Sequence, residues 1–513
     1  MPVSHQIMYA QPNEQGPLRH AAPATHDIFS QKLTKPVFID GAWILPLIQG
    51  GKGVGATNGV NAGAWAAENA GGTIAATGAA IGYDENGREL SYSYAEKSRP
   101  KRHDELIALS VEGCILQAKT AFKAAAGKGR IRINFLKMAG GSMQIMREAL
   151  AGTRLCSGGN MIHAVTMGAG LPSEEDAQIC SDEGVFLDPI ISSAMAMKVL
   201  LKRTFRKWAG KYDEIIGAVV YEDPWLAGGH NGLTSREDPD TPNDPYERVK
   251  ALRIIMNDNG MEKVAIIMAG GVWYLRDWLP WLENPEIGPI AFQIGTRDLL
   301  TAESPITDEW KHLLLSMNEG DIALNKFSPT GFYSSAYKNS MILELFERSQ
   351  RQVPYAVEPD EAMTIKINGP GIPVKGYMVR AEDKVKIDMW THSGFNTALR
   401  TPDNTLVFVS PEKAREIKQD RVDCVGCLAT CHLSAWSQNP ETKYNTGRAP
   451  DPRVHCIRKG LLGAIQGYDL DNNLIFAGHN AYLAGEDPFY RDQNGNIFIP
   501  TVKQLVNRLL TGD

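Results

Sequence analysis

The sequence repeatedly places a glycine-rich loop directly after a short apolar run. The first such loop, Gly50 to Gly53, follows Leu47 and Ile48, and a helical stretch and a second apolar run come after it. A glycine loop between a buried strand and a helix lets a flat or anionic ligand approach the main chain closely. Ligand-free turns use glycine as well, so one loop alone favours the two readings about equally.

Two later loops shift the balance towards a ligand. The run Val264–Met268 ends in Ala269-Gly270-Gly271, and the run Ile290–Gln293 ends in Gly295-Thr296. Consecutive strands that end in small residues with free main-chain N–H groups form the usual phosphate site of a (β/α)8 barrel, after strands seven and eight. The spacing therefore predicts a phosphate-bearing ligand at the mouth of a barrel.

The number of apolar runs agrees with that fold. Most of the runs are followed by helix-forming sequence, as alternating strands and helices require. The eight runs cover residues 42–48, 73–76, 131–136, 161–165, 186–191, 216–221, 264–268 and 290–293. We therefore expect an α/β fold, a (β/α)8 TIM barrel with a C-terminal mixed β and cysteine-rich extension.

The chain divides into three parts on the same pattern. Residues 1–35 are polar and aperiodic and are expected to form an N-terminal arm, residues 36–345 the barrel, and residues 346–513 the extension. In the extension, short apolar runs between turn residues predict a small sheet, and the last run predicts a helix. The predicted strands cover 364–367, 376–380, 385–389 and 405–409, and the helix covers 502–510.

Composition excludes several classes of function. The chain has 513 residues, 43% of them hydrophobic, and a formal net charge of -6, so it can bury a barrel core and has no basic footprint for nucleic acid. No stretch approaches the roughly 20 uninterrupted apolar residues that a membrane span needs, and the N-terminus lacks a secretory pattern. We expect a cytoplasmic protein that acts on a small molecule without nucleic acid or membrane. The sequence does not indicate its oligomeric state.

Five motifs resemble those of a known family. They are the loop at 47–55, the run Gly168-Ala169-Gly170-Leu171-Pro172, the segment Ala227-Gly228-Gly229-His230-Asn231-Gly232, Ala269-Gly270-Gly271, and Gln293-Ile294-Gly295-Thr296. In this order they resemble the nitronate monooxygenase (2-nitropropane dioxygenase) family, which also includes FMN-dependent enoyl-acyl-carrier-protein reductases. The resemblance implies a TIM barrel that holds FMN non-covalently.

The resemblance also assigns cofactor contacts. It implies that the first loop lies against the flavin ring, that a side chain at the end of strand three bonds the ring, and that the last two loops take the phosphate. The residues so implied are Gly51, Lys52, Gly53, Asn134, Gly229, Gly270, Gly271, Gln293, Gly295 and Thr296. One of them departs from the family pattern, because Lys52 stands where the family usually has Met. A cation there would stabilise the anionic reduced flavin, or it would point away to solvent.

His230 is the predicted catalytic residue. It follows two glycines at the C-terminal end of a predicted barrel strand, where this fold places its catalytic groups. Imidazole can exchange a proton near neutral pH. The resemblance implies a base or a substrate-orienting group at this position. Glu222 and Asp223, a few residues earlier, fit a solvated turn at least as well.

Four cysteines in the extension form a second candidate site. Cys424, Cys427 and Cys431 follow the spacing CxxCxxxC, and Cys456 comes later. Thiolates at such a spacing can bind one metal centre, and the predicted occupant is a [4Fe–4S] cluster, with zinc as the alternative. The same spacing occurs in flavin-barrel reductases of the dienoyl-CoA reductase kind. If the site binds zinc, His432 and His455 could replace cysteines as ligands. The alternative without a metal is that the cysteines are reduced thiols with a structural role.

Three functions remain open at this point. The first is an FMN-dependent oxygenase that oxidises a nitronate or similar carbanion with O2. The second is an NAD(P)H-dependent reductase of an enoyl thioester that uses FMN, with an iron–sulfur cluster as electron relay. The third is a non-catalytic assembly module held by zinc on a degenerate barrel.

Overall fold

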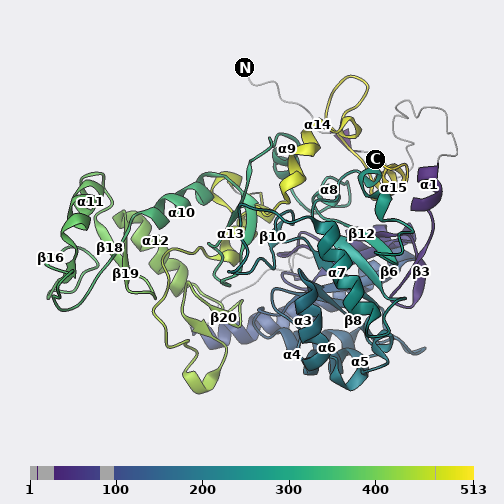
Figure 1. Ribbon diagram of the computed structural model, residues 1–513, viewed down its shortest axis with the longest axis horizontal. Helices are drawn as coiled ribbons and strands as arrows, with labels where there is room; N and C mark the ends of the chain where they lie inside the picture. The colour runs from purple at the N-terminus through teal and green to yellow at the C-terminus, as the bar shows by residue number, and fades with distance from the viewer. Residues whose placement is uncertain (1–7, 10–27, 81–97, 468) are drawn as a thin grey trace.

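The computed structural model describes residues 8–9, 28–80, 98–467 and 469–513, and its central feature is a closed barrel (Figure 1). Eight parallel strands form the barrel, and each is followed by helical or loop structure on the outside. In barrel order the strands are β4 (Leu47–Gln49), β5 (Gly71–Ala75), β6 (Arg130–Leu136), β7 (Ala164–Gly168), β8 (Phe186–Ile191), β9 (Ala218–Glu222), β11 (Ala265–Ala269) and β12 (Ile290–Ile294). The predicted (β/α)8 fold is confirmed.

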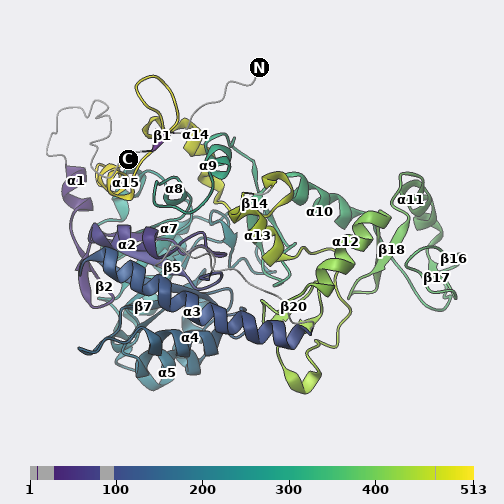
Figure 2. The same cartoon turned by 180° about the vertical axis from the view of Figure 1, so that it is seen from behind.

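Helices cover the outside of this barrel. Their starts follow from side-chain caps: Asn58, Ser173, Ser193 and Asp244 each accept a hydrogen bond from a main-chain N–H in the first turn of the helix that follows. The helices are α1 (Ile28–Leu33), α2 (Gly59–Ala67), α3 (Arg99–Ala125), α4 (Ser142–Gly152), α5 (Glu174–Asp182), α6 (Ala194–Arg203), α7 (Pro245–Asn257), α8 (Thr296–Leu299) and α9 (Asp308–Leu315). In Figure 2 the long helix α3 runs across the barrel towards β20.

The first predicted run, 42–48, is not one strand. Residues Ala42–Ile44 form β3, which pairs antiparallel with β2 (Val37–Ile39), and the barrel strand β4 begins only at Leu47. Pro46 lies between the two strands and has no N–H to continue a ladder. The prediction of a single barrel strand over this range was therefore wrong in its first half.

The hairpin closes the bottom of the barrel with a buried charge network. Asp40, in its turn, accepts a 2.7 Å hydrogen bond from Nε of Arg132, and the same guanidinium also bonds Asp188. All three side chains are fully buried. The network fixes the hairpin against β6 and β8, at the end of the barrel opposite the glycine loops.

The extension contains several small sheets and helices. Helix α10 (Ser340–Gln350) leads into it, and its elements are β15 (Gln352–Pro354), β16 (Ile365–Ile367), β17 (Tyr377–Val379), α11 (Ala381–His392), β18 (Thr397–Arg400), β19 (Thr405–Val409), α12 (Pro411–Val422), β20 (Thr430–Cys431), β21 (Trp436–Ser437), α13 (Ile457–Ile465), α14 (Leu483–Glu486), β22 (Phe498–Ile499) and α15 (Val502–Leu509). The preceding barrel region also contains three short strands outside the barrel, β10 (Gly229–His230), β13 (Ile322–Asn325) and β14 (Ser334–Tyr337). β10 lies in the loop after β9 and pairs with β14. The sheets β15-β19-β18 and β16-β17 form a lobe that projects away from the barrel (Figures 1 and 2).

One predicted strand of the extension is helical. The run 385–389 lies inside α11, because its alternating apolar residues do not mark a buried face: Val385 is 73% exposed and Met389 is 59% exposed. The predicted strands near 365, 377 and 405 are present, as is the C-terminal helix. β15 and β18 were not predicted.

Beyond its projecting lobe, the extension returns to the barrel. Val502, Leu505, Val506 and Leu509 of α15 are buried in the same apolar core as the barrel helices, and β22 pairs with β1 (Met8–Tyr9). The barrel therefore rests against segments that are distant in sequence. Within the described part of the chain, no helix is long and apolar enough to cross a membrane.

Candidate functional site

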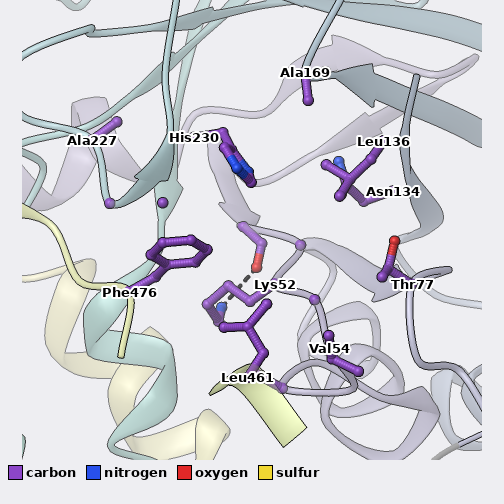
Figure 3. Close-up of a pocket in the computed structure, with 18 of the residues that line it drawn as sticks. Lys52, Val54, Thr77, Asn134, Leu136, Ala169, Ala227, His230, Leu461 and Phe476 are labelled. Carbon is purple, nitrogen blue, oxygen red and sulfur yellow. Dashed lines mark hydrogen bonds between the residues drawn. The ribbon is translucent and has the colours of Figure 1, made fainter. Parts of the chain in front are cut away.

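A single cavity lies at the C-terminal ends of the barrel strands, and the predicted cofactor and catalytic residues of the barrel all line it (Figure 3). In the close-up, His230 and Phe476 face Asn134 and Thr77 across the cavity. The predicted residues that line it are Gly51, Lys52, Gly53, Asn134, Gly229, His230, Gly270, Gly271, Gln293, Gly295 and Thr296. The structure thus brings together residues from five separate glycine-containing or polar segments.

One end of the cavity has the donors of an anion site. Gly270 and Gly271 have φ angles of +92° and +76°, which favour glycine, and both line the cavity. Within the described residues, no hydrogen bond engages the main-chain N–H groups of Gly270, Gly271 or Gly295. Thr296 Oγ1 accepts a hydrogen bond from Gly478 N at 3.3 Å, so its own hydrogen is free to donate. Unengaged donors beside a cavity suit a phosphate.

Gly295 shows that this end is hollow. A Cβ atom added to Gly295 would have no heavy atom within 4 Å. Its φ of -94° is accessible to any residue. A side chain at this position would therefore enter the cavity without straining the protein.

The middle of the cavity suits a flat ring. A Cβ atom on Gly51 would lie 2.6 Å from Asn134 Cβ and 2.9 Å from Thr73 Cγ2, so the loop can pass here only as glycine. Asn134 is held in turn by a 3.0 Å hydrogen bond from its Nδ2 to Thr166 Oγ1. These contacts bring bare main chain to the cavity wall, as stacking on a planar ligand requires.

The side chain of Lys52 does not point away to solvent, the second of the two positions considered from the sequence. Its ammonium donates to Gly50 O at 2.7 Å, drawn as a dashed line in Figure 3, and to Asp298 Oδ2 at 2.8 Å. Asp298 is fully buried and also accepts from Trp65 Nε1 at 2.6 Å. Burial lowers the pKa of Lys52, and Asp298 opposes that shift. The cation is therefore held within the cavity wall.

His230 points into the cavity and is bonded from behind. Its Nε2 lies 2.7 Å from Ser328 Oγ, and its ring packs edge-on against Phe476 at a centroid distance of 5.4 Å. Burial lowers the pKa of His230 to about 4, so the imidazole is uncharged at neutral pH. The site holds a neutral imidazole beside the predicted flavin position.

The sequence interpretation missed Glu222. It ends β9 and lines the cavity with His230, whereas its sequence position fits a solvated turn at least as well. Burial, and then the neighbouring Asp223, raise its pKa to about 8. The carboxyl makes no hydrogen bond or ion pair with another described residue.

The extension supplies a further wall that was also missed. Phe476, Gly478 and Asn480 line the cavity, and Asn480 Nδ2 donates to Gly271 O at 2.8 Å. The sequence does contain a sign that this segment belongs to the site: the tripeptide Gly-His-Asn occurs twice, at 229–231 and at 478–480. The two segments touch: a Cβ atom on Gly228 would lie 2.5 Å from the Ala477 carbonyl carbon.

The cysteine segment adjoins the same cavity. Cys427 lines it, and main-chain hydrogen bonds fix the segment to the loop after β6, from Gly140 N to Cys427 O at 3.0 Å and from Ala429 N to Met138 O at 2.7 Å. Burial, followed by the other three thiols Cys456, Cys431 and Cys424, raises the pKa of Cys427 well above its usual value. The four thiols therefore lie close enough to act on one another.

A metal-ion site is not preformed there. All four cysteines are free thiols, and Cys424 Sγ donates to Ser434 Oγ at 3.3 Å. Among the residues that the structure describes, no group of three or more His, Cys, Asp or Glu side chains is arranged to hold a metal ion. Both nitrogens of His455, a substitute ligand, are buried with no hydrogen-bond partner among the described residues. The four-cysteine site stays a prediction.

Comparisons with solved structures find several proteins that are similar to this chain. The enoyl reductase domain of MlnA from the macrolactin biosynthesis cluster of Bacillus amyloliquefaciens is similar at 11% identity and a TM-score of 0.52, over 91% of this chain and 93% of that chain. This likeness shows a shared fold. FabK from Thermotoga maritima matches at 14% identity and a TM-score of 0.47, over 94% of both chains. A nitroalkane oxidase from Streptomyces ansochromogenes matches at 15% identity and a TM-score of 0.37, over 61% of this chain and 80% of that chain.

No curated protein sequence matches the chain. A family model does: the one described as nitronate monooxygenase matches residues 152–406, a range that includes His230 and the loops at 270–271 and 295–296. The resemblance inferred from the glycine loops is therefore confirmed over residues 152–406, the part of the chain that matches the nitronate monooxygenase family.

Proposed function

We propose that this protein is an FMN-dependent oxidoreductase that oxidises a nitronate or a similar carbanion with O2. The observation that carries the proposal is the cavity itself, where unengaged main-chain donors at 270, 271 and 295 lie at one end and His230 lies beside the space for a ring. This donor set fits a flavin phosphate.

The fit extends to the ring. Gly51 and Gly53 would line the isoalloxazine with bare main chain, and Asn134 would bond its edge. When bound there, FMN would supply the electron acceptor for the substrate carbanion and would pass electrons on to O2. The protein's own part is to bind the phosphate, hold the ring, and present His230 to the substrate.

The remaining walls indicate the substrate class. Val54, Leu136 and Leu461 line the cavity in Figure 3, and they suit a small molecule with an alkyl portion. A hydrogen-bond donor from His230 would suit the charged oxygens of a nitronate. The cysteine-bearing segment forms part of the cavity wall through Cys427.

The NAD(P)H-dependent enoyl-thioester reductase is the second candidate. Two observations favour it: the apolar cavity walls could take an acyl chain, and Glu222 offers a carboxyl whose raised pKa would let it protonate Cα. The non-catalytic assembly module is the third candidate. It would leave the intact glycine loops without a role.

Oxygen consumption by the FMN-loaded protein separates the candidates. The proposal expects uptake with a preformed alkyl nitronate in the absence of pyridine nucleotide, and loss of that uptake in His230→Leu. Oxidation of NAD(P)H that depends on an enoyl-CoA, with no nitronate activity, would instead establish the reductase. Inactivity of the flavin-loaded protein in both assays would leave only the assembly module.

We also propose that Cys424, Cys427, Cys431 and Cys456 ligate one [4Fe–4S] cluster, with zinc as the alternative. The support is their mutual proximity, their burial, and the position of Cys427 at the cavity, where a second redox centre could exchange electrons with FMN. Metal analysis of anaerobically purified protein tests this. Iron with acid-labile sulfide would support the cluster, zinc alone would support the alternative, and neither would refute both.

We retain the three-part division as a proposal: an arm at 1–35, the FMN-binding barrel at 36–345 and the extension at 346–513. Its support is that the barrel strands all fall within 36–345. Limited proteolysis that cut the folded protein mainly near residues 35 and 345 would support these boundaries.

A further inference from the structure

We propose that Glu222 is the residue that transfers protons at this cavity, and that His230 holds the substrate as a neutral hydrogen-bond donor. The inference rests on the proposed function and assigns its proton chemistry to a different residue from the one that the sequence indicates. It follows from the directions of the hydrogen bonds that link His230 to Ser328 and Thr330, and from the position of Glu222.

The hydrogen bonds behind His230 are all satisfied in only one direction among the described residues. Phe332 N donates to Thr330 Oγ1 at 3.2 Å, and Thr330 N donates to Ser328 Oγ at 3.3 Å. The two hydroxyls are 2.8 Å apart, and Ser328 Oγ is 2.7 Å from His230 Nε2. If Thr330 donates its hydroxyl hydrogen to Ser328, the single hydrogen of Ser328 remains for Nε2. The reverse direction would leave the Thr330 hydrogen without an acceptor among the described residues.

This arrangement fixes the tautomer of His230. Because Nε2 accepts from Ser328, Nδ1 carries the hydrogen and is the nitrogen left for a ligand. The lone pair that a general base needs is already used. The lowered pKa of the buried ring agrees, because it keeps the imidazole neutral and makes the imidazolium a rare species at neutral pH. His230 is suited to donate a hydrogen bond, and another group must move the proton.

Glu222 is placed to be that group. It lies at the C-terminal end of β9, the position from which this fold presents catalytic side chains, and it lines the same cavity as His230. Its neighbour Asp223 is engaged by the N–H groups of Trp225 at 3.0 Å and Leu226 at 2.9 Å. The Glu222 carboxyl makes no such bond within the described part of the chain.

The electrostatic surroundings tune this carboxyl for proton transfer. Asp223 is the charged neighbour that adds to the effect of burial, and together they bring the pKa of Glu222 to about 8. Other titratable groups that line the cavity are Lys52, Arg458 and Cys427, and the Lys52 ammonium is paired with Asp298. A group that titrates near the working pH is the most efficient general acid or base.

The proton step balances with residues and substrate alone. With a neutral nitroalkane, the Cα–H bond breaks, the proton passes to a carboxylate oxygen of Glu222, and the electron pair moves onto the nitro group to form the nitronate. The Nδ1–H of His230 donates to a nitro oxygen. With an enoyl thioester the direction reverses, because the protonated carboxyl of Glu222 would give its proton to Cα.

The test compares neutral nitroethane, freshly dissolved, with preformed ethylnitronate as substrates of FMN-loaded protein. Glu222→Gln should lower the ratio of the initial rate on nitroethane to the initial rate on ethylnitronate by roughly 10²-fold or more, because the anion needs no base. The wild-type rate on nitroethane should rise as the pH passes about 8, and the variant should lose this step. Glu214→Gln, which removes an exposed carboxylate, is the matched control.

Equal losses on both substrates, or no loss on either, would overturn the role of Glu222. Failure of the wild type on both substrates would instead refute the nitronate function. A measurement without substrate then decides the inference: an infrared difference spectrum should show a protonated carboxyl at pH 7 that disappears above about pH 8 and is absent from Glu222→Gln. A spectrum without that signal would refute the proposal for any substrate.

Discussion

Replacing Gly295 with Asp should strongly weaken FMN binding and leave the fold intact. A side chain at this position meets no heavy atom within 4 Å of its Cβ, and φ is -94°, so the apo protein should unfold at the wild-type temperature. The carboxylate would enter the end of the cavity where Gly270 and Gly271 present their N–H groups. There the negative charge of the carboxylate would repel the phosphate that the N–H groups attract.

The size of the effect follows from charge. Two unit charges about 4 Å apart near a protein surface repel by about 4 kcal/mol, and 1.4 kcal/mol is a factor of ten. The Kd for FMN should therefore rise by about 10³-fold, measured by quenching of flavin fluorescence with apo protein. Gly295→Asn has the same size without the charge and should lose far less affinity. Wild-type affinity in Gly295→Asp would refute the placement of the phosphate.

Two further predictions concern other parts of the barrel. His230→Asn keeps an N–H near the position of Nδ1, so its kcat/KM on a nitronate should stay within about tenfold of wild type. The kcat/KM of His230→Leu should fall by about 10²-fold, because a hydrogen bond to a charged group is lost. Equal losses in the two variants would contradict the donor role. Arg132→Met leaves Asp40 and Asp188 buried without a cation and should lower the free energy of unfolding in urea by about 3–5 kcal/mol. A change below about 1 kcal/mol would contradict the proposed importance of the network.

The barrel could be predicted because its signal is local. A strand such as 131–136 or 264–268 is buried on both faces and appears as a continuous apolar run. The prediction merged residues 42–44, the second strand of the hairpin, with β4 because both are apolar and close in sequence, and Pro46 lies between them. The run 385–389 imitates a strand by alternation, although packing buries only Ile387 of its apolar residues. Local pattern does not report such tertiary burial.

The residues of the candidate site likewise divide into those that the sequence predicts and those that it does not. Its glycines were predictable because each loop follows its own strand. Glu222, Ser328 and Phe476 were not, since their roles depend on contacts between distant parts of the chain: Ser328 reaches His230 across 98 positions in the sequence. The environment that raises the pKa of Glu222 exists only after the barrel has closed. The repeated Gly-His-Asn tripeptide was the one local sign that residues 478–480 join the site.

The central claim is that this cavity binds FMN by its phosphate, and a paired titration of apo protein with FMN and riboflavin tests it most directly. FMN should bind in a 1:1 ratio and show the flavin absorbance maxima at about 370 and 450 nm. Riboflavin, which lacks the phosphate, should bind at least about 10²-fold more weakly, because the donors at 270, 271, 295 and 296 would remain unpaired. Equal affinity for the two ligands, or no binding of FMN, would contradict the account.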